Sequence, residues 1–264
     1  MAPAEITCLV WFFSCLVLTS GHTQLRYYSQ EYAQTGVSIH PDNNGLGFSP
    51  SKLPYGCEYI RSTHNVRPVV ILITGLEVMC DVDTDGGGWL IIQRRVTGTI
   101  QFYRGWEEYK YGFGSFYLGE FYLGNQKIHE LTNLAEYELR IDMKYNEYDY
   151  YARYSSFRLG SEKDGYRIRL GEYRGNAGDS LIEFHDRMKF STFDMDNDKC
   201  GPANCAEYFR GAWWYNECLT AHLNGVWGSK LYGTGLNWMT LTNYTESVTF
   251  SEMKIRRIKC VGCL

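Results

Sequence analysis

The sequence predicts an α+β domain with a mainly antiparallel sheet. Beyond residue 55, much of the chain divides into short apolar or β-branched segments bounded by turn residues, which is typical of strands. One segment has a helical spacing of apolar residues, and no internal repeat is evident. With 264 residues, the chain is long enough for one large domain or two small ones. This mixture of strands and a helix favours the α+β class.

The first residues have the pattern of a secretory signal, which we expect to span 1–21. Residues 6–18 are apolar, and the small residues Thr19, Ser20 and Gly21 follow. A membrane-spanning helix needs roughly 20 apolar residues, so this run is too short. Cleavage near Gly21 is favoured over an uncleaved anchor, although the preceding segment carries Glu5 and no Lys or Arg. The sequence therefore predicts a secreted, extracellular protein.

The remainder is expected to comprise a flexible leader at 22–53 and a globular domain at 54–264. The leader is polar, with neither Gly-X-Y repeats nor heptads, so no stalk or coiled coil is visible. A helix is expected at 121–131, with Leu123, Ile128 and Leu131 as its apolar positions. The expected strands are 69–73, 77–80, 89–95, 137–143, 151–159, 166–170 and 253–258.

Charge and composition argue against two classes of binding protein. The formal net charge of −4 does not suit a general nucleic-acid surface, which needs clustered Lys and Arg. The glycines at 86–88 are followed by neither Lys-Ser/Thr nor a helix, which excludes a P-loop. The 22 Tyr and 7 Trp residues suit recognition surfaces that are half apolar and half hydrogen-bonding, although aromatic residues also fill cores.

Three alternating carboxylates, at Asp194, Asp196 and Asp198, suggest a cation site. Calcium takes six to eight oxygen ligands, and a Gly-Pro turn that follows supplies backbone carbonyls. An EF-hand is excluded because its sixth and twelfth positions would be Lys199 and Cys205 instead of Gly and Glu. The alternative is a polar turn, since Asp and Asn side chains bond the backbone two residues on.

The cysteine count indicates disulfides and at least one unmatched thiol. Two of the nine cysteines, Cys8 and Cys15, would leave with the signal. In a secreted protein the others are expected to pair, and an odd number leaves one thiol buried or linked to another chain. The remaining seven are Cys57, Cys80, Cys200, Cys205, Cys218, Cys260 and Cys263.

Eight phrases in a fixed order give the chain a resemblance to the fibrinogen-like domain, covering nearly everything from 55 to 258. Among the members of this family, the chain resembles secreted lectins such as ficolins, tachylectins and molluscan fibrinogen-related proteins. The phrases are CDVDTDGGGWLIIQRR (80–95), GFGSFYLGEFYLGN (112–125), KIHELT (127–132), FSTFDMDND (190–198), NCAEYFRGAWWYNEC (204–218), HLNGVW (222–227), LNWMT (236–240) and SEMKIR (251–256).

The resemblance implies a single disulfide-stapled α+β domain whose calcium- and ligand-binding part covers about 190–250. It implies the disulfides Cys57–Cys80 and Cys205–Cys218. It also makes the acidic loop a structural calcium site, with the carboxylates of Asp196 and Asp198 and the carbonyls of about Cys200 and Pro202 as ligands. Asp194 is expected to bond the loop backbone instead. The loop is one residue longer than usual, so the carbonyl positions could shift by one.

In tachylectin-like members an acetyl group lies in an aromatic funnel beside the calcium loop. Carried over by position, the walls would be Phe209, Tyr232 and Tyr244, and the donors to the acetyl oxygen would be the N–H groups of Cys218 and Leu219. Core packing is the alternative role for these rings. The Glu217–Cys218 peptide falls where the family often has a cis bond. Two positions depart from the family: Phe209 replaces a common Tyr, and Leu219 replaces a common His.

These features predict a secreted, calcium-dependent lectin for acetylated or other glycan groups, probing foreign surfaces in innate immunity. The alternative is an extracellular protein ligand of the angiopoietin-like or clot type that uses the same face to bind a peptide or receptor. An enzyme is not expected, because no Ser/His/Asp or Cys/His arrangement has supporting context. Asn243 begins an N-glycosylation sequon, and Cys200, Cys260 or Cys263 are candidate interchain links for a homo-oligomer.

Overall fold

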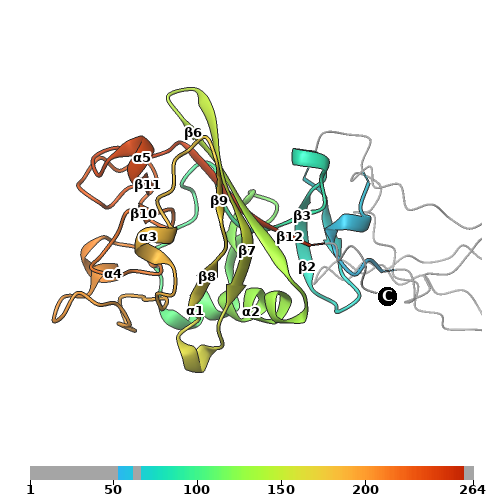
Figure 1. Ribbon diagram of the computed structural model, residues 1–264, viewed down its shortest axis with the longest axis horizontal. Helices are drawn as coiled ribbons and strands as arrows, with labels where there is room; N and C mark the ends of the chain where they lie inside the picture. The colour runs from blue at the N-terminus through green and yellow to red at the C-terminus, as the bar shows by residue number, and fades with distance from the viewer. Residues whose placement is uncertain (1–52, 62–66, 259–264) are drawn as a thin grey trace, which may run out of the picture.

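A twisted antiparallel sheet forms the centre of the computed structural model, which describes residues 53–61 and 67–258 (Figure 1). The main strand order is β1-β2-β3-β12-β6-β7-β8, and every described pairing is antiparallel. The predicted signal, nearly all of the predicted leader, Cys260 and Cys263 lie outside the described residues. The predicted α+β class with a mainly antiparallel sheet is confirmed.

The sheet is built from four long inner strands and several shorter ones. Its strands are β1 (Val69–Ile71), β2 (Glu77–Asp81), β3 (Trp89–Arg95), β4 (Phe113–Ser115), β5 (Glu120–Tyr122), β6 (Tyr137–Tyr145), β7 (Tyr148–Leu159), β8 (Ile168–Leu170), β9 (Tyr173–Gly175) and β12 (Phe250–Arg257). A separate two-stranded ladder joins β10 (Ala221–His222) and β11 (Asn237–Trp238).

The helices are short. They are α1 (Trp106–Tyr111), α2 (Asn125–Leu134), α3 (Ile182–His185), α4 (Cys205–Tyr208) and α5 (Met239–Thr242), with single 3₁₀ turns η3 (Cys57–Tyr59), η4 (Thr84–Gly86) and η5 (Glu162–Asp164). None of the helices in 53–61 or 67–258 is long and apolar enough to cross a bilayer.

The prediction of a helix over 121–131 is wrong at its start. Glu120–Tyr122 is strand β5, which pairs with β3 and β4. The helix begins only after Gly124, whose φ of 115° lies in the region that favours glycine. A Cβ at Gly124 would stand 2.7 Å from the carbonyl carbon of Tyr111, so this strand-to-helix junction requires glycine. Ile128 and Leu131 do face the core from the helix.

Strand β12, the last described element, lies between β3 and β6 and unites the two halves of the sheet. Near its middle, Lys254 is fully buried among three carboxylates, those of Asp81, Asp142 and Glu252. Its Nζ lies 3.0 Å from Glu252 Oε1. The three acceptors come from β2, β6 and β12 itself, so one ammonium group ties three strands together.

The segment from about 176 to 249 forms a part with little sheet on one side of the strands, where α3, α4, α5, β10 and β11 gather (left in Figure 1). Its interior is aromatic: Trp213, Trp214 and Trp238 are fully buried. The same apolar cluster continues into the sheet, so both parts share one core. This part carries all of the metal- and ligand-binding residues predicted from the sequence.

Candidate functional site

The acidic loop is ordered by hydrogen bonds to its own carboxylates. The Asp198 N–H donates to Asp196 Oδ1 at 3.1 Å. The two carboxylate oxygens of Asp198 accept the N–H groups of Cys200, at 2.8 Å, and Cys205, at 2.9 Å. Asp198 therefore connects the loop to the first residue of α4.

The donor set of this loop fits a hard cation. Burial raises the pKa of the Asp198 carboxyl above its ordinary value, and the neighbouring Asp196 carboxylate acts in the same direction. A divalent cation beside the pair would oppose both effects. The carbonyl oxygen of Cys200 accepts only a long bond, 3.4 Å, from the Ala203 N–H. All of these ligand atoms are oxygens, as calcium prefers.

Asp194 has a different role from the other two carboxylates. Its Oδ1 and Oδ2 accept the Trp106 N–H at 2.9 and 3.2 Å, and Oδ1 also accepts the Thr192 hydroxyl at 2.6 Å. Asp194 thus bonds the backbone at the start of α1. The prediction that it would bond the backbone of the acidic loop is wrong. Gly105 permits this approach, because a Cβ there would lie 2.6 Å from Asp194 Oδ2.

The predicted aromatic walls are brought together, but they are not equally accessible. The Tyr232 side chain is 60% exposed, and its ring centroid lies 5.0 Å from that of the half-buried Tyr244. The Tyr244 hydroxyl donates to the Leu219 carbonyl at 3.2 Å. Phe209 is only 7% exposed, so it supports the face from below.

The N–H groups of Cys218 and Leu219 donate to no acceptor among the described residues. The next two N–H groups, of Thr220 and Ala221, are both bonded. The expected cis bond at Glu217–Cys218 is absent, since every described peptide bond is trans. The trans form is the ordinary outcome, because a non-proline cis bond costs about 3 kcal/mol.

Two buried histidines, not predicted as site residues, hold this segment in place. His185 Nε2 accepts the Thr220 and Ala221 N–H groups, both at 3.0 Å. The Nδ1 atom of the same ring lies 2.7 Å from the Trp214 carbonyl oxygen, which can only accept, so Nδ1 carries the proton. Burial lowers the pKa of His185 to about 4. No motif in the sequence marked this residue.

His222 fixes the segment that carries Tyr232. Its Nδ1 donates to the Gly233 carbonyl at 3.2 Å, which leaves Nε2 to accept the Tyr215 hydroxyl at 2.9 Å. Burial lowers the pKa of His222 to about 3. The sequence phrase HLNGVW placed this histidine in the framework, and its complete burial agrees.

Gly233, next to Tyr232 in the chain, packs closely against the ring of Phe209. It has a φ of 70°, and a Cβ there would lie 2.3 Å from the Phe209 ring. Replacement of Gly233 by Ala is expected to reduce the free energy of unfolding by about 1–3 kcal/mol through overpacking. Gly228→Ala is the matched control, because its φ is 72° but nothing lies within 4 Å of the added Cβ. Urea unfolding of both variants measures the difference, and equal losses would contradict a steric role for Phe209.

Asn243 of the sequon is exposed at the end of α5. The adjacent Tyr244 is half-buried against the binding face, while Thr245 is exposed. A glycan on Asn243 would therefore start at the edge of this face, and occupancy of the sequon stays a prediction.

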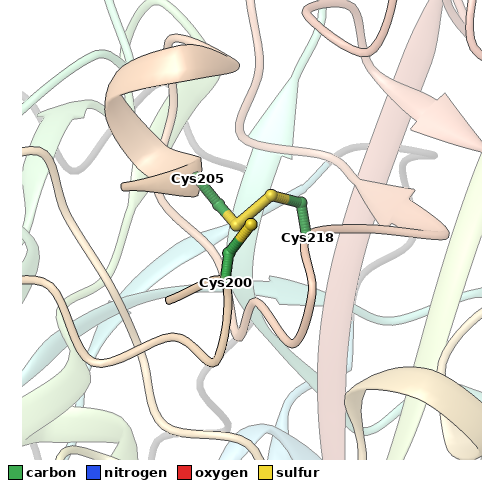
Figure 2. A group of neighbouring side chains, drawn as sticks. All are labelled: Cys200, Cys205 and Cys218. Atoms are coloured by element: carbon green, nitrogen blue, oxygen red, sulfur yellow. A yellow bond between two sulfur atoms is a disulfide. The ribbon is translucent and has the colours of Figure 1, made fainter. Parts of the chain in front are cut away.

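Both disulfides implied by the family resemblance are present. Cys57 pairs with Cys80, and Cys205 pairs with Cys218. Among the described residues, only Cys200 has a thiol outside a disulfide, and it is partly exposed. Its sulfur and those of Cys205 and Cys218 all lie within 4.8 Å of one another (Figure 2).

Comparison with known proteins agrees with this architecture. Residues 61–258 match the family described as "Fibrinogen beta and gamma chains, C-terminal globular domain". Fibrinogen C domain-containing protein 1 of mouse is 44% identical over 194 residues, covering 70% of this chain and 42% of that protein. The human protein of the same name is also 44% identical, over 70% of this chain and 41% of its own length. The chain thus spans about two-fifths of these relatives.

Solved structures show the same fold. The fibrinogen-like globe domain of human ANGPTL6 superposes with a TM-score of 0.70 at 38% identity, covering 75% of this chain and 91% of that domain. Lamprey fibrin D-dimer, complexed with the peptide Gly-His-Arg-Pro-amide, gives a TM-score of 0.68 at 29% identity, covering 89% of this chain and 84% of its own.

The family match extends over most of the described residues and includes the acidic loop and the Cys205–Cys218 disulfide, while Cys57 of the other disulfide lies just before the matched range. Proteins with this domain are generally extracellular binding proteins, and no enzyme family is indicated. The chain belongs to the fibrinogen C-terminal globular domain family.

Proposed function

We propose that this chain is a secreted, calcium-dependent lectin, not an enzyme, that binds acetylated groups such as those of N-acetylated glycans. The observation that carries the proposal is the pair of N–H groups at Cys218 and Leu219, which have no acceptor among the described residues. They lie in a segment whose Leu219 carbonyl accepts the hydroxyl of the half-buried Tyr244, and the Tyr244 ring lies 5.0 Å from that of the exposed Tyr232. Unpaired donors beside apolar rings suit a ligand with a carbonyl oxygen and a methyl group.

The proposed ligand contacts divide between polar and apolar groups. The two N–H groups would donate to the acetyl oxygen, and the rings would contact the acetyl methyl group. The Leu219 side chain is only 6% exposed, so this residue offers a ligand its backbone N–H and little side-chain surface. A single shallow site of this kind is expected to bind in the millimolar range, so useful avidity requires several linked copies.

Calcium would act structurally, held by Asp196, Asp198 and the backbone carbonyls of about Cys200 and Pro202. Asp198 accepts the Cys205 N–H, and Cys205 is bonded to Cys218, one of the proposed donors. This covalent and hydrogen-bonded connection is the physical reason to expect metal and ligand binding to be coupled.

A second candidate is binding of a peptide or a protein receptor by the same face. The match to lamprey fibrin in complex with Gly-His-Arg-Pro-amide favours it, as does the match to an angiopoietin-like globe domain.

Retention on acetylated beads separates these two functions. We expect the full chain to bind acetylated agarose in millimolar calcium and to elute with free N-acetylglucosamine or with a chelator. The sugar competes with the beads for the proposed site, and the chelator removes the calcium that orders it. Unmodified agarose is the control matrix. Failure to bind acetylated beads, combined with calcium-dependent retention on immobilised Gly-His-Arg-Pro-amide, would replace the lectin proposal with the peptide-binding alternative.

Replacement of Asp196 by Ala tests the coupling between metal and ligand. We expect it to abolish the calcium-dependent rise in thermal stability, which for a saturating ion at a hundredfold excess over its Kd is about 2.7 kcal/mol. Capture on acetylated beads should be lost with it. Asp149→Ala is the control, since that carboxylate is 79% exposed in the β6–β7 hairpin. Unchanged capture by the Asp196 variant would show that the metal and the ligand site are independent.

A further inference from the structure

A free thiol lies directly beside a disulfide in the proposed binding part. The sulfur atoms of Cys200, Cys205 and Cys218 are within 4.8 Å of one another, and Figure 2 shows the Cys200 side chain directed at the Cys205–Cys218 bond. Cys205 is completely buried, whereas Cys200 and Cys218 are partly exposed. The bonded pair uses two of these sulfurs, so the group is a thiol–disulfide cluster and not a metal site.

We propose that Cys200 exchanges with this disulfide and moves the bond of Cys205 from Cys218 to itself. The Cys200 thiol loses its proton to solvent, and the thiolate attacks Cys205 Sγ. The Cys200–Cys205 bond forms as the Cys205–Cys218 bond breaks, and Cys218 leaves as a thiolate that takes a proton from solvent. One disulfide and one thiol are present before and after, so no oxidant or reductant is consumed.

Burial decides which sulfur is attacked and which one leaves. Attack on Cys218 would expel a thiolate at Cys205, which has no solvent exposure, and an unpaired buried charge is costly. Attack on Cys205 expels the thiolate of Cys218 instead. Cys218 is partly exposed, so solvent can stabilise that charge. The second route is therefore the one that the structure favours.

The backbone holds the attacking and attacked residues in register. The two oxygens of Asp198 accept the N–H groups of Cys200 and Cys205, at 2.8 and 2.9 Å, so one carboxylate fixes both residues. Such preorganisation raises the effective concentration of the thiol at the disulfide. The new bond would join residues five positions apart instead of 13, and a short loop is entropically easier to close.

Exchange would remove the covalent link between α4 and the segment that carries the Cys218 and Leu219 N–H groups. Cys218 would then be held only by noncovalent contacts, and the proposed ligand donors would lose their fixed position. The exchange itself is independent of ligand identity, but this consequence for binding rests on the proposed function.

Disulfide mapping of the full chain tests the exchange without any ligand. The protein is equilibrated near pH 8 without reductant, pulsed with N-ethylmaleimide, quenched in acid and digested for mass spectrometry. We expect the label on both Cys200 and Cys218, together with a Cys200–Cys205 linked peptide. In Cys200→Ser, the label on Cys218 and the new linked peptide should both be lost. A label on Cys200 alone, or a disulfide from Cys200 to Cys260 or Cys263, overturns the proposal.

A second variant traps the exchanged form and keeps the test decisive if that form is scarce. Cys218→Ser, refolded with oxidised glutathione, should form a Cys200–Cys205 disulfide and leave neither residue open to alkylation. The double variant Cys200→Ser/Cys218→Ser is the control and should leave Cys205 reactive after unfolding. A Cys218→Ser protein with native circular dichroism but reactive thiols at Cys200 and Cys205 would show that the two sulfurs cannot bond. Neither result depends on binding to acetylated beads.

Discussion

Replacement of Lys254 by Met is expected to reduce the free energy of unfolding by about 3–5 kcal/mol. The Lys254 ammonium group is completely buried and contacts the carboxylates of Asp81, Asp142 and Glu252, whose side chains are 0, 21 and 1% exposed. Without the ammonium group, arginines are the remaining cationic partners of these carboxylates among the described residues. Asp81 also keeps the backbone N–H groups of Asp83 and Thr84 as donors. Burial alone would raise the pKa of Asp81, but Lys254 outweighs burial and holds that pKa well below its ordinary value.

The measurement is urea unfolding at pH 7, and the control is Lys144→Met. Lys144 is 56% exposed and lies 3.4 Å from Asp149, which is 79% exposed, so its loss should change stability by no more than about 0.5 kcal/mol. Equal effects of the two substitutions would contradict a structural role for the buried ion cluster.

Acidification from pH 7.5 to pH 5 is expected to destabilise the binding face through His185 and His222. Their pKa values fall from 6.5 to about 4 and about 3, because burial disfavours the charged ring. The unfolded chain binds protons at both histidines below pH 6.5, while the folded chain does not. Stability is therefore present above pH 6.5 and is lost as the pH falls toward the folded pKa, by about 2 kcal/mol for each histidine at pH 5.

The pH range of this effect separates it from that of the carboxylates, which also destabilise the fold on acidification. Glu252, whose pKa is lowered by Lys254 and Arg67 despite its burial, contributes stability that is lost only below its unfolded pKa of about 4.5. Guanidinium unfolding between pH 7.5 and pH 5 thus reports mainly on the histidines. His185→Gln should remove about half of the pH response, and the control His129→Gln should leave it intact. An unchanged response in His185→Gln would rule out this mechanism.

The parts of the fold that depend on side-chain pattern were predictable from the sequence. Strand β3 has the expected bounds, because its apolar residues are continuous and end at turn residues on the N-terminal side. The residue pattern did not distinguish strand β5 from the first turn of the expected helix. Phe121, Tyr122 and Leu123 are all buried, and such a continuous apolar run fits a buried strand as well as a buried helix. Only the backbone of Gly124 decides between them.

The site depends more on tertiary contacts, and less of it was predictable. The resemblance located both disulfides, and it named Tyr232 and Tyr244, whose rings lie 5.0 Å apart and whose role as ligand walls stays a prediction. It did not show that Asp194 bonds α1, because Trp106 lies 88 positions earlier in the chain. His185 also escaped prediction, since its partners at Thr220 and Ala221 come from a distant loop.

The position of β12 has a consequence for biosynthesis. Because this strand fills the space between β3 and β6, the sheet stays divided until the ribosome has released residue 257. Until then β3 and β6 each present an unpaired edge, and such edges are prone to pair with other nascent chains. The sheet of this domain therefore closes only after β12 has left the ribosome, and transient shielding of the β3 and β6 edges by chaperones would matter most until then.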